Sequence, residues 1–491
     1  PRKQPRLILG PDGGSLEDSV QDQIKGKLAY ENDLFRVDGQ LGYWVNDFER
    51  EGRSFLRDPS GATFTRGNIR VNDLVYTVPA TAFGPQDGRE EHLLSAITAR
   101  TLRDRGWNVS TVASLYDIGE DVLRSSIATD ANAQAGTIAD GGSGRGWWNV
   151  DVQTSYRSDE LPHTLTFGYY HSRYELGSKT YATSDWRRGA RGALTAASQG
   201  VTTQRALYTQ DAWKLAPSWT ATAGLRFESW EASNGQRQRT ENGAVVTARY
   251  ADLDETAVSP KLSLAYAPGG YVLRYTVGHG VRFATASELF QGSQSGTTIT
   301  NNNPHLQPED SLSHDLTLET TLAVRHEVRV SLFHDDVEDS IAQQLNQTTN
   351  VTNIQNVDRV VTTGLEFVYK VKGLLPNVVI DANLSLVNSK IEENSALPVS
   401  EGKHWLRIPR ARANLVANWA FRPQWNLNLA ARHSGRQFNE LDNSDVNSKV
   451  FGGTSQFTTL DTRLGYTWRE RFELGLGVEN LTNEEYYAFH P

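Results

Sequence analysis

The sequence repeats one cycle: an amphipathic segment, a short turn, a second amphipathic segment and a long polar connection. The last pair, residues 457–479, is the clearest case, because apolar side chains alternate with Asp, Arg, Glu and Gly on both sides of the turn RER at 469–471. Alternation with a period of two residues indicates β-strands with two different faces. One apolar and one polar face is the pattern of a strand that lies between lipid and a wet or protein-filled lumen.

The same pattern recurs along most of the chain. The earlier strand pairs are predicted at 21–48, 92–117, 147–174, 203–230, 257–280, 311–337, 361–389 and 409–435. From 147 onward the turns within these pairs are DELP, APS, PGG, AVR, KGLLP and RPQ, which are short and rich in Pro, Gly and charge. Residues 1–20 are polar and Gly-rich, and we expect them to form a loop.

Between the pairs the chain makes much longer connections, at Glu49–Glu90, Ile118–Arg145, Glu175–Thr202, Glu231–Thr256, Val281–Asp310, Glu338–Val360, Ile391–Ile408 and Gly435–Gln456. The first of these contains a weaker hairpin, GNIRVNDLVYTV, with a turn expected at Asn72 and Asp73. Short turns at one end and long loops at the other are typical of outer-membrane barrels.

We predict an all-β transmembrane antiparallel barrel that occupies residues 1–491 as one domain. About 18 strands are visible in the pattern, whereas large plugged transporters have about 22. The expected remainder is three strands before Gln21 and one after Pro491, which would pair with Phe472–Glu479.

Composition narrows the class of protein. Mean hydropathy is −0.51 and no apolar run approaches the 18 residues of a membrane helix, which excludes a helical membrane protein. The 12 Trp and 18 Tyr fit interfacial aromatic girdles. A net charge of −9 argues against a nucleic-acid partner, and the absence of Cys excludes disulfides and thiolate metal sites.

Two segments carry a family resemblance. The final strand pair leads into NLTNEEYY, Asn480–Tyr487, and together they resemble the C-terminal signature of TonB-dependent outer-membrane receptors. The run GHGVRFATASELF, Gly278–Phe290, is similar to a family segment at the outer end of a strand. The resemblance implies a bacterial outer-membrane receptor surrounded by lipid, with a plug domain that is not in this chain.

The same resemblance implies a function. In this family a scarce nutrient binds on the outside, and the TonB–ExbB–ExbD complex drives its uptake. Ferric siderophores are the commonest cargo, followed by cobalamin, haem, copper complexes or another ligand of cofactor size. We expect no intrinsic cofactor and no enzymatic activity, since no GxSxG elbow or grouping of Ser, His and carboxylate stands out. A passive channel and an outer-membrane hydrolase remain as alternatives.

Candidate ligand contacts are aromatic and basic residues in the long connections. Guanidinium groups suit the carboxylates of an anionic metal chelate, and aromatic rings suit stacking. The candidates are Tyr181, Trp186, Arg187, Arg188, Arg282, Phe283, Trp405, Arg436 and Phe438. Tyr181–Arg188 ranks highest because it is expected well inside a loop. For Arg282 a structural role is the alternative to ligand binding. We assign Trp147 and Trp148 to the lipid-facing aromatic belt.

Other polar groups receive a structural interpretation. The lumen face of one strand is expected to carry Arg412, Asn414 and Asn418, with the apolar residues on its other face. On the neighbouring strand, the lumen face is expected to carry Asp381 and Asn383. The acidic clusters 334–339 and 442–445 lack the spacing of a calcium loop and are interpreted as solvated loop charge. His404 and His433 lie at loop edges without metal-site spacing. We therefore predict no metal site.

Overall fold

The computed structural model describes most of the chain. The described residues are 2–9, 13–71, 74–78, 80–128, 133–241, 243–295, 298–323, 325–346, 351–446, 448, 454–469 and 471–488.

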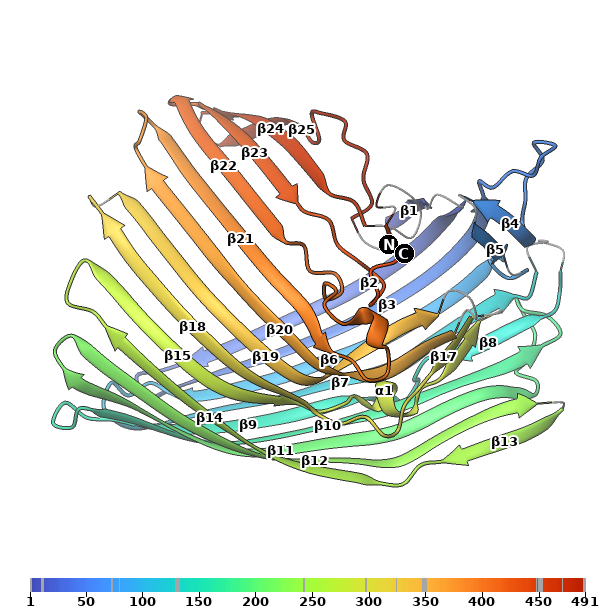
Figure 1. The fold of residues 1–491 in the computed structure, drawn as a ribbon, viewed down its shortest axis with the longest axis horizontal. Coiled ribbons are helices and arrows are strands. Elements are labelled where there is room, and N and C mark those ends of the chain that lie inside the picture. The colour runs from blue at the N-terminus through green and yellow to red at the C-terminus, as the bar shows by residue number, and fades with distance from the viewer. Residues whose placement is uncertain are drawn as a thin grey trace.

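Within these ranges 23 strands form one sheet, and each long strand pairs antiparallel with the next long strand. The long strands are β1 (Arg2–Leu9), β2 (Gly13–Glu31), β3 (Phe35–Ser54), β6 (Gln86–Thr101), β7 (Gly106–Ser126), β9 (Arg145–Arg157), β10 (His163–Thr183), β11 (Leu194–Ala216), β12 (Trp219–Glu241), β14 (Leu253–Tyr266), β15 (Tyr271–Arg282), β18 (Glu309–Leu322), β19 (His326–Asn346), β20 (Val351–Lys372), β21 (Val378–Glu393), β22 (Ala411–Arg422), β23 (Trp425–Ser434), β24 (Phe457–Trp468) and β25 (Phe472–Val478). The sheet curves into a wall in which the first strands lie behind the later ones (Figure 1). This confirms the predicted all-β barrel class.

Short elements cluster at the end of the wall that carries the long connections (Figure 1). β8 (Gly136–Asp140) pairs with both β7 and β10, and β13 (Ala244–Arg249) pairs with β12. β16 (Ser293–Ser295) pairs with β17 (Thr298–Asn301), which runs parallel to β20. β4 (Gly67–Val71) and β5 (Leu74–Val78) form a separate hairpin, as predicted, although Asn72 and Asp73 lie outside the described residues. α1 (Ala286–Phe290) and a 3-10 turn, Pro398–Ser400, complete the described elements.

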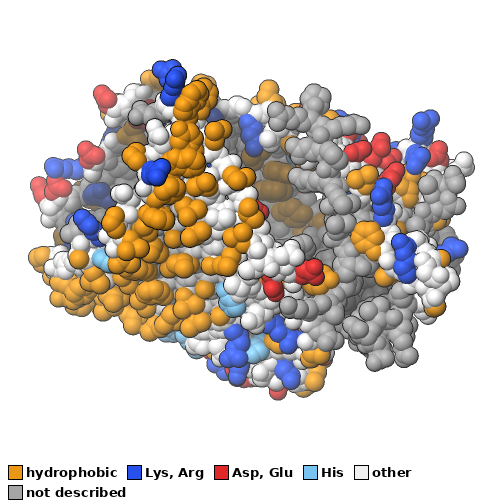
Figure 2. Space-filling model, turned by 90° about the horizontal axis from the view of Figure 1, so that it is seen from above, with side chains coloured by type: hydrophobic (Ala, Val, Ile, Leu, Met, Phe, Trp, Pro, Cys, Tyr) orange, Lys and Arg blue, Asp and Glu red, His pale blue; other side chains and the backbone are white. Residues whose placement is uncertain are grey.

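Alternation along each strand gives the wall its two faces. On β12, Leu225 and Phe227 are each 48% exposed, while Glu228 between the lumen residues Arg226 and Trp230 is 5% exposed. Arg226 and Glu228 form an ion pair of 2.9 Å, so charge on this strand is satisfied inside the wall. Figure 2 shows hydrophobic side chains over a wide continuous area, with charged side chains mainly around its margins. This distribution matches the apolar outer band of a membrane barrel.

The predicted lumen residues lie as the alternation indicated. Asn383 pairs with Asn414 in the register of β21 and β22, and the Asn414 side-chain amide donates to Asn383 Oδ1 at 2.9 Å. Leu415 and Trp419 on the other face are 47% and 46% exposed. A one-residue error in register would have exchanged these faces.

The boundaries of several elements differ from the prediction. Residues 1–20 are not a loop. They contain β1 and the start of β2, and these two strands pair with each other. Several long connections are also shorter than expected, since strands continue through them: β10 and β11 leave only 184–193 between them. The outer halves of these strands are polar and lack an apolar face. The alternating pattern therefore stops before the strand does, and the sequence placed the strand ends too early.

No helix among the described residues has the length and apolar character needed to cross a membrane. Among the same residues β1 pairs only with β2 and β25 only with β24, so the first and last strands are not hydrogen-bonded to each other. The predicted partner strand for Phe472–Glu479 stays a prediction.

Candidate ligand-binding site at the outer rim

The candidate residues lie at the end of the wall with the long connections, which we call the outer rim. They form three separate groups: Tyr181–Arg188 at the tip of β10 and β11, Arg282 and Phe283 at the end of β15, and Trp405, Arg436 and Phe438 in the connections after β21 and β23.

In the first group Tyr181 is not inside a loop, which corrects the prediction. It belongs to β10 and pairs with Ile138 of β8, and the Arg191 guanidinium lies 5.3 Å from its ring centre. The apparent loop is a strand because β8 provides a second hydrogen-bonding partner above β9. The contact with Arg191 shows that this ring can receive a cation.

Trp186 anchors the tip of this hairpin. It is only 2% exposed, and its indole Nε1 donates to the carbonyl of Ala133 at 3.2 Å. A buried Trp with its N–H satisfied is a stable packing element. Its ring is therefore not free for a ligand in this conformation.

Arg187 and Arg188 are both exposed at the same tip. Their backbone N–H groups donate to Asp185 Oδ1 at 3.0 and 3.2 Å, which fixes the turn and leaves both guanidinium groups outside it. The Arg187 guanidinium lies 4.8 Å from the ring centre of Trp186. The tip thus presents two positive charges on a rigid base.

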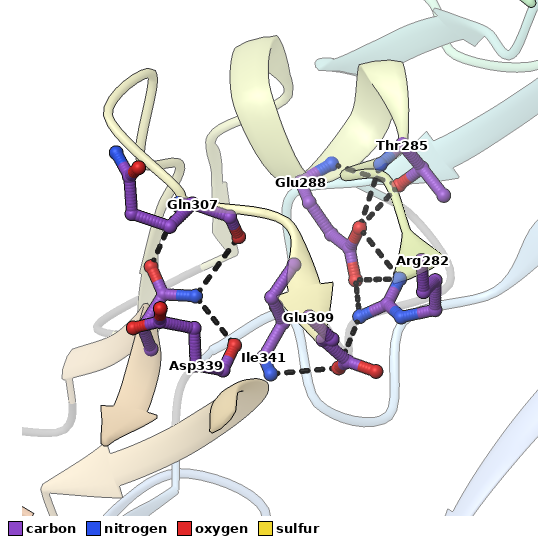
Figure 3. A network of polar contacts seen from close by, with 8 residues as sticks. Arg282, Thr285, Glu288, Gln307, Glu309, Asp339 and Ile341 are labelled. Atoms are coloured by element: carbon purple, nitrogen blue, oxygen red, sulfur yellow. Dashed lines mark hydrogen bonds and ion pairs between the residues drawn. The ribbon is translucent and has the colours of Figure 1, made fainter. Parts of the chain in front are cut away.

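In the second group Arg282 is held by two carboxylates (Figure 3). Its guanidinium donates to Glu288 at 3.2 Å and to Glu309 at 2.9 Å. Burial acts to lower the pKa of Arg282, but the hydrogen bonds to Glu309 and Glu288 outweigh it and raise that pKa above its usual value. These contacts fit a structural role for Arg282, which was the alternative to ligand binding.

The same network starts the helix α1. Thr285 caps it: the Glu288 backbone N–H donates to the Thr285 hydroxyl at 3.2 Å, and the Thr285 N–H donates to the Glu288 carboxylate at 2.7 Å. This reciprocal capping box satisfies backbone donors that a helix start leaves open. The Glu309 carboxylate also accepts the backbone N–H of Ile341, which ties the segment to β19.

Below this network α1 packs against the inner side of β10, β11 and β12. Phe290 is fully buried there, and a Cβ at either Gly200 of β11 or Gly235 of β12 would overlap its ring. Phe283 is 8% exposed and stacks on Trp230 with ring centres 5.5 Å apart and planes 4° apart. The segment after β15 is therefore a small folded core inside the rim.

A cavity of about 490 Å³ opens beside this core. That volume lies in the range of small-molecule sites. Its lining residues are Tyr174, Thr202, Gln204, Trp230 and the run Val281–Ser287. Among the candidates, Arg282 and Phe283 line it.

In the third group two connections interlock. Asn443 donates from its side chain to the His404 carbonyl at 2.9 Å and accepts the His404 N–H at 2.8 Å. The Phe438 ring stacks with that of His404 at 5.8 Å and lies 4.4 Å from the Arg436 guanidinium. Trp405 is half-buried against the adjoining apolar cluster of Val357, Ile391 and Leu441. Phe438 and Arg436 are therefore in contact, as they must be if both bind one ligand. Trp405 instead supports the loop.

The acidic clusters have structural environments. His334–Glu338 lie within β19 and not in a loop, and Asp336 pairs with Arg359 at 2.6 Å. Asp445 accepts the Asn439 N–H at 2.8 Å, and burial raises its pKa. Within the described ranges, no three His, Asp or Glu side chains come together in a way that could hold a metal ion.

Sequence reasoning missed the cavity residues that lie on strands. Tyr174, Gln204 and Trp230 were predicted as strand residues, and Thr202 as the end of the connection Glu175–Thr202. It also placed Trp147 on the lipid face, but Trp147 pairs with Tyr116 and stacks on its ring at 4.0 Å, on the same face of β9 as Asp151, which binds the inward Tyr208. Only Trp148 lies on the outer face. The available signal was strict alternation: adjacent Trp residues in one strand must point opposite ways.

A wide antiparallel wall with an apolar outer band, short turns at one end and a structured rim at the other defines an outer-membrane β-barrel. Residues 22–481 match the family model described as TonB dependent receptor-like, beta-barrel, and the chain belongs to that family. It is thus a barrel of the Gram-negative outer membrane, within a family of receptors and transporters.

Individual relatives are distant. The chain is 22% identical over 302 residues to the vitamin B12 transporter BtuB of Vibrio vulnificus (strain YJ016), a match that covers 57% of this chain and 45% of that protein. The fold is similar to the ferric citrate transporter FecA, with TM-score 0.66, 18% identity, and coverage of 98% of this chain and 70% of FecA. It is also similar to the ferric yersiniabactin uptake receptor FyuA from Yersinia pestis, with TM-score 0.63, 14% identity, and coverage of 99% and 76%. These structural likenesses concern the fold.

Proposed function

We propose that this protein binds a scarce metal chelate, a ferric siderophore, at the outer rim and imports it by TonB-coupled active transport. The observations that support the proposal are exposed cationic groups and a cavity, both at the same end of the barrel. Arg187 and Arg188 stand at the rim, and a cavity of about 490 Å³ opens on its inner side. Guanidinium groups attract the anionic donors of a chelate, and a concave, partly apolar cavity holds its body.

Cobalamin uptake is a second candidate, supported by the 22% identity to a vitamin B12 transporter. Cobalamin is also a metal complex of cofactor size, so the same rim and cavity suit it. A haem or copper complex is a further possibility within the same class of cargo.

Growth of a deletion strain tests the cargo. The full-length gene should restore growth under iron limitation on at least one ferric siderophore, and inactivation of TonB should abolish that growth. If the gene restores growth only where cobalamin is the limiting nutrient, cobalamin uptake would be favoured. Unchanged growth on every siderophore would rule out the siderophore assignment, and uptake that persists without TonB would indicate a passive channel.

A further inference from the structure

A row of aromatic rings crosses the inner face of the wall. It comprises Trp44 on β3, His92 on β6, Tyr116 on β7, Trp147 on β9 and Tyr174 on β10, which are successive neighbours in the sheet. Successive ring centres lie 5.1, 5.4, 4.0 and 6.4 Å apart. Three of these distances fall in the range of favourable aromatic contacts, about 4.5–7 Å, and the stacked rings of Tyr116 and Trp147 lie closer together.

The register places these rings on one face. Trp44 pairs directly with His92, and Trp147 pairs directly with both Tyr116 and Tyr174. Directly opposed residues on antiparallel strands project from the same side of the sheet. Trp147 remains 42% exposed, so part of the row is open to the lumen.

The row is interrupted on the next strand and then resumes. On β11, Thr202 pairs with Tyr174 and Gln204 pairs with Trp230 of β12. Trp230 in turn stacks on Phe283. Two polar side chains therefore stand where a ring would make the row continuous, and the cavity of about 490 Å³ lies at this gap, lined by Tyr174, Thr202, Gln204, Trp230 and Phe283.

The cations around the gap are already paired. Among the described residues that line the cavity, Arg282 is the one that carries a charge, and Glu288 and Glu309 bind its guanidinium. Gln204 donates to Glu228 at 2.8 Å, and Glu228 pairs with Arg226. A polyanion would therefore find no free cation among the described residues that line the cavity, whereas a flat ring would find the half-buried ring of Tyr174 at one end; Trp230, which is 6% exposed and stacks on Phe283, closes the other end.

We infer that the cargo carries a flat, conjugated ring system of low net charge, and that this ring lies in the gap between Tyr174 and Trp230. This inference rests on the proposed uptake of a metal chelate and names the part of the chelate that the cavity recognises. Stacking on Tyr174 supplies the attraction, and the polar side chains at the base of the gap supply hydrogen-bonding partners for ring substituents.

A variant that fills the gap tests the inference. Gln204→Trp places an indole on β11 between Tyr174 and Trp230, in the space that the ligand ring would occupy. The matched control is Leu207→Trp on the same strand, where the native side chain is 61% exposed on the lipid side. Tyr174→Leu is a second variant, which removes one stacking surface without adding volume.

Binding is measured with the purified full-length protein and four probes. Cyanocobalamin and haem carry conjugated rings from two different sources; ferric citrate and ferrichrome carry none. The wild-type protein should bind one of the ring-bearing probes. For that probe we expect at least a tenfold loss of affinity in Gln204→Trp, a several-fold loss in Tyr174→Leu and no change in Leu207→Trp. The probe that responds identifies the source of the ring.

Each other outcome overturns the inference in a recognisable way. Wild-type affinity of Gln204→Trp and Tyr174→Leu for a ring-bearing probe would show that the ring lies elsewhere. Binding of ferric citrate or ferrichrome alone would remove the ring requirement but leave chelate uptake standing. Failure of the wild-type protein to bind any metal chelate, in these assays and in growth tests, would remove the proposed function itself.

Discussion

Two segments of the rim contain the same kinds of residue and use them in opposite ways. The tip of β10 and β11 and the segment after β15 each place an arginine next to an aromatic residue. Both arginines are exposed, but Arg187 lies over Trp186 with no carboxylate of the described residues on its guanidinium, whereas Arg282 is bound by Glu288 and Glu309. In both segments the aromatic residue is buried. The difference shows that the neighbouring carboxylates, and not the Arg-aromatic pair itself, decide whether a cation is available to a ligand.

The largest expected effect comes from the anchor of the segment after β15. Phe290→Ala empties the space formed at Gly200 and Gly235, and loss of a buried Phe side chain typically costs about 3–5 kcal/mol. We expect residues 283–308 to become sensitive to limited proteolysis and the thermal unfolding temperature to fall. Phe227→Ala, which removes a ring that is 48% exposed on the lipid side, is the matched control. Equal protease resistance of Phe290→Ala and wild type would contradict the anchoring role.

A smaller effect is expected from the network above this anchor. Arg282→Gln removes the cation shared by Glu288 and Glu309 and leaves the two carboxylates uncompensated, at a cost of about 1.5 kcal/mol. Hydrogen exchange of the α1 backbone should accelerate, while that of β12 should stay unchanged. If Arg282 instead acts mainly on a ligand, affinity will fall with no change in exchange.

The exposed tip should behave in the reverse manner. Replacement of Arg187 and Arg188 together by Ala should change stability by less than about 0.5 kcal/mol, because neither side chain is buried. Affinity for an anionic ferric chelate should fall about tenfold at low salt, with a smaller loss at high salt where exposed charges are screened. Isothermal titration at two salt concentrations measures both effects. A loss that does not depend on salt would mean that the arginines position the loop and do not attract the ligand.

The smallest effect concerns the interlocked connections of the third group. Burial, followed by the charge of Arg410, lowers the pKa of His404 below its usual 6.5. The folded form with neutral His404 is therefore favoured above pH 6.5, and this contribution is lost as the pH falls through the lowered value. Hydrogen exchange in 394–410 and 436–446 should increase modestly at acidic pH. His404→Phe keeps the stacking on Phe438 and should remove the pH dependence; persistence of that dependence would assign it to another group.

The sequence predicted the wall better than the rim, for a physical reason. Within the membrane, lipid imposes an apolar face on every strand, so that Leu415 and Trp419 could be separated from Asn414 by counting. Above the membrane this constraint ends, and Tyr181 was placed in a loop although it pairs with β8. Phe290 illustrates the same limit: its burial depends on Gly200 and Gly235, which lie on strands distant in the sequence. Trp147 was misassigned by composition, and attention to its register would have placed it correctly.

The continuation of the strands above the bilayer has a mechanical consequence. β11 has 23 residues; at about 3.4 Å per residue it is about 78 Å long. With a tilt near 45° it rises about 55 Å, roughly twice the height of the apolar band of a barrel. Cross-strand hydrogen bonds stiffen this upper part, so it should stand as a collar that keeps its opening without a ligand. Any closure over captured cargo would then be confined to short tips such as 184–193, and antibodies or proteases would meet those tips first.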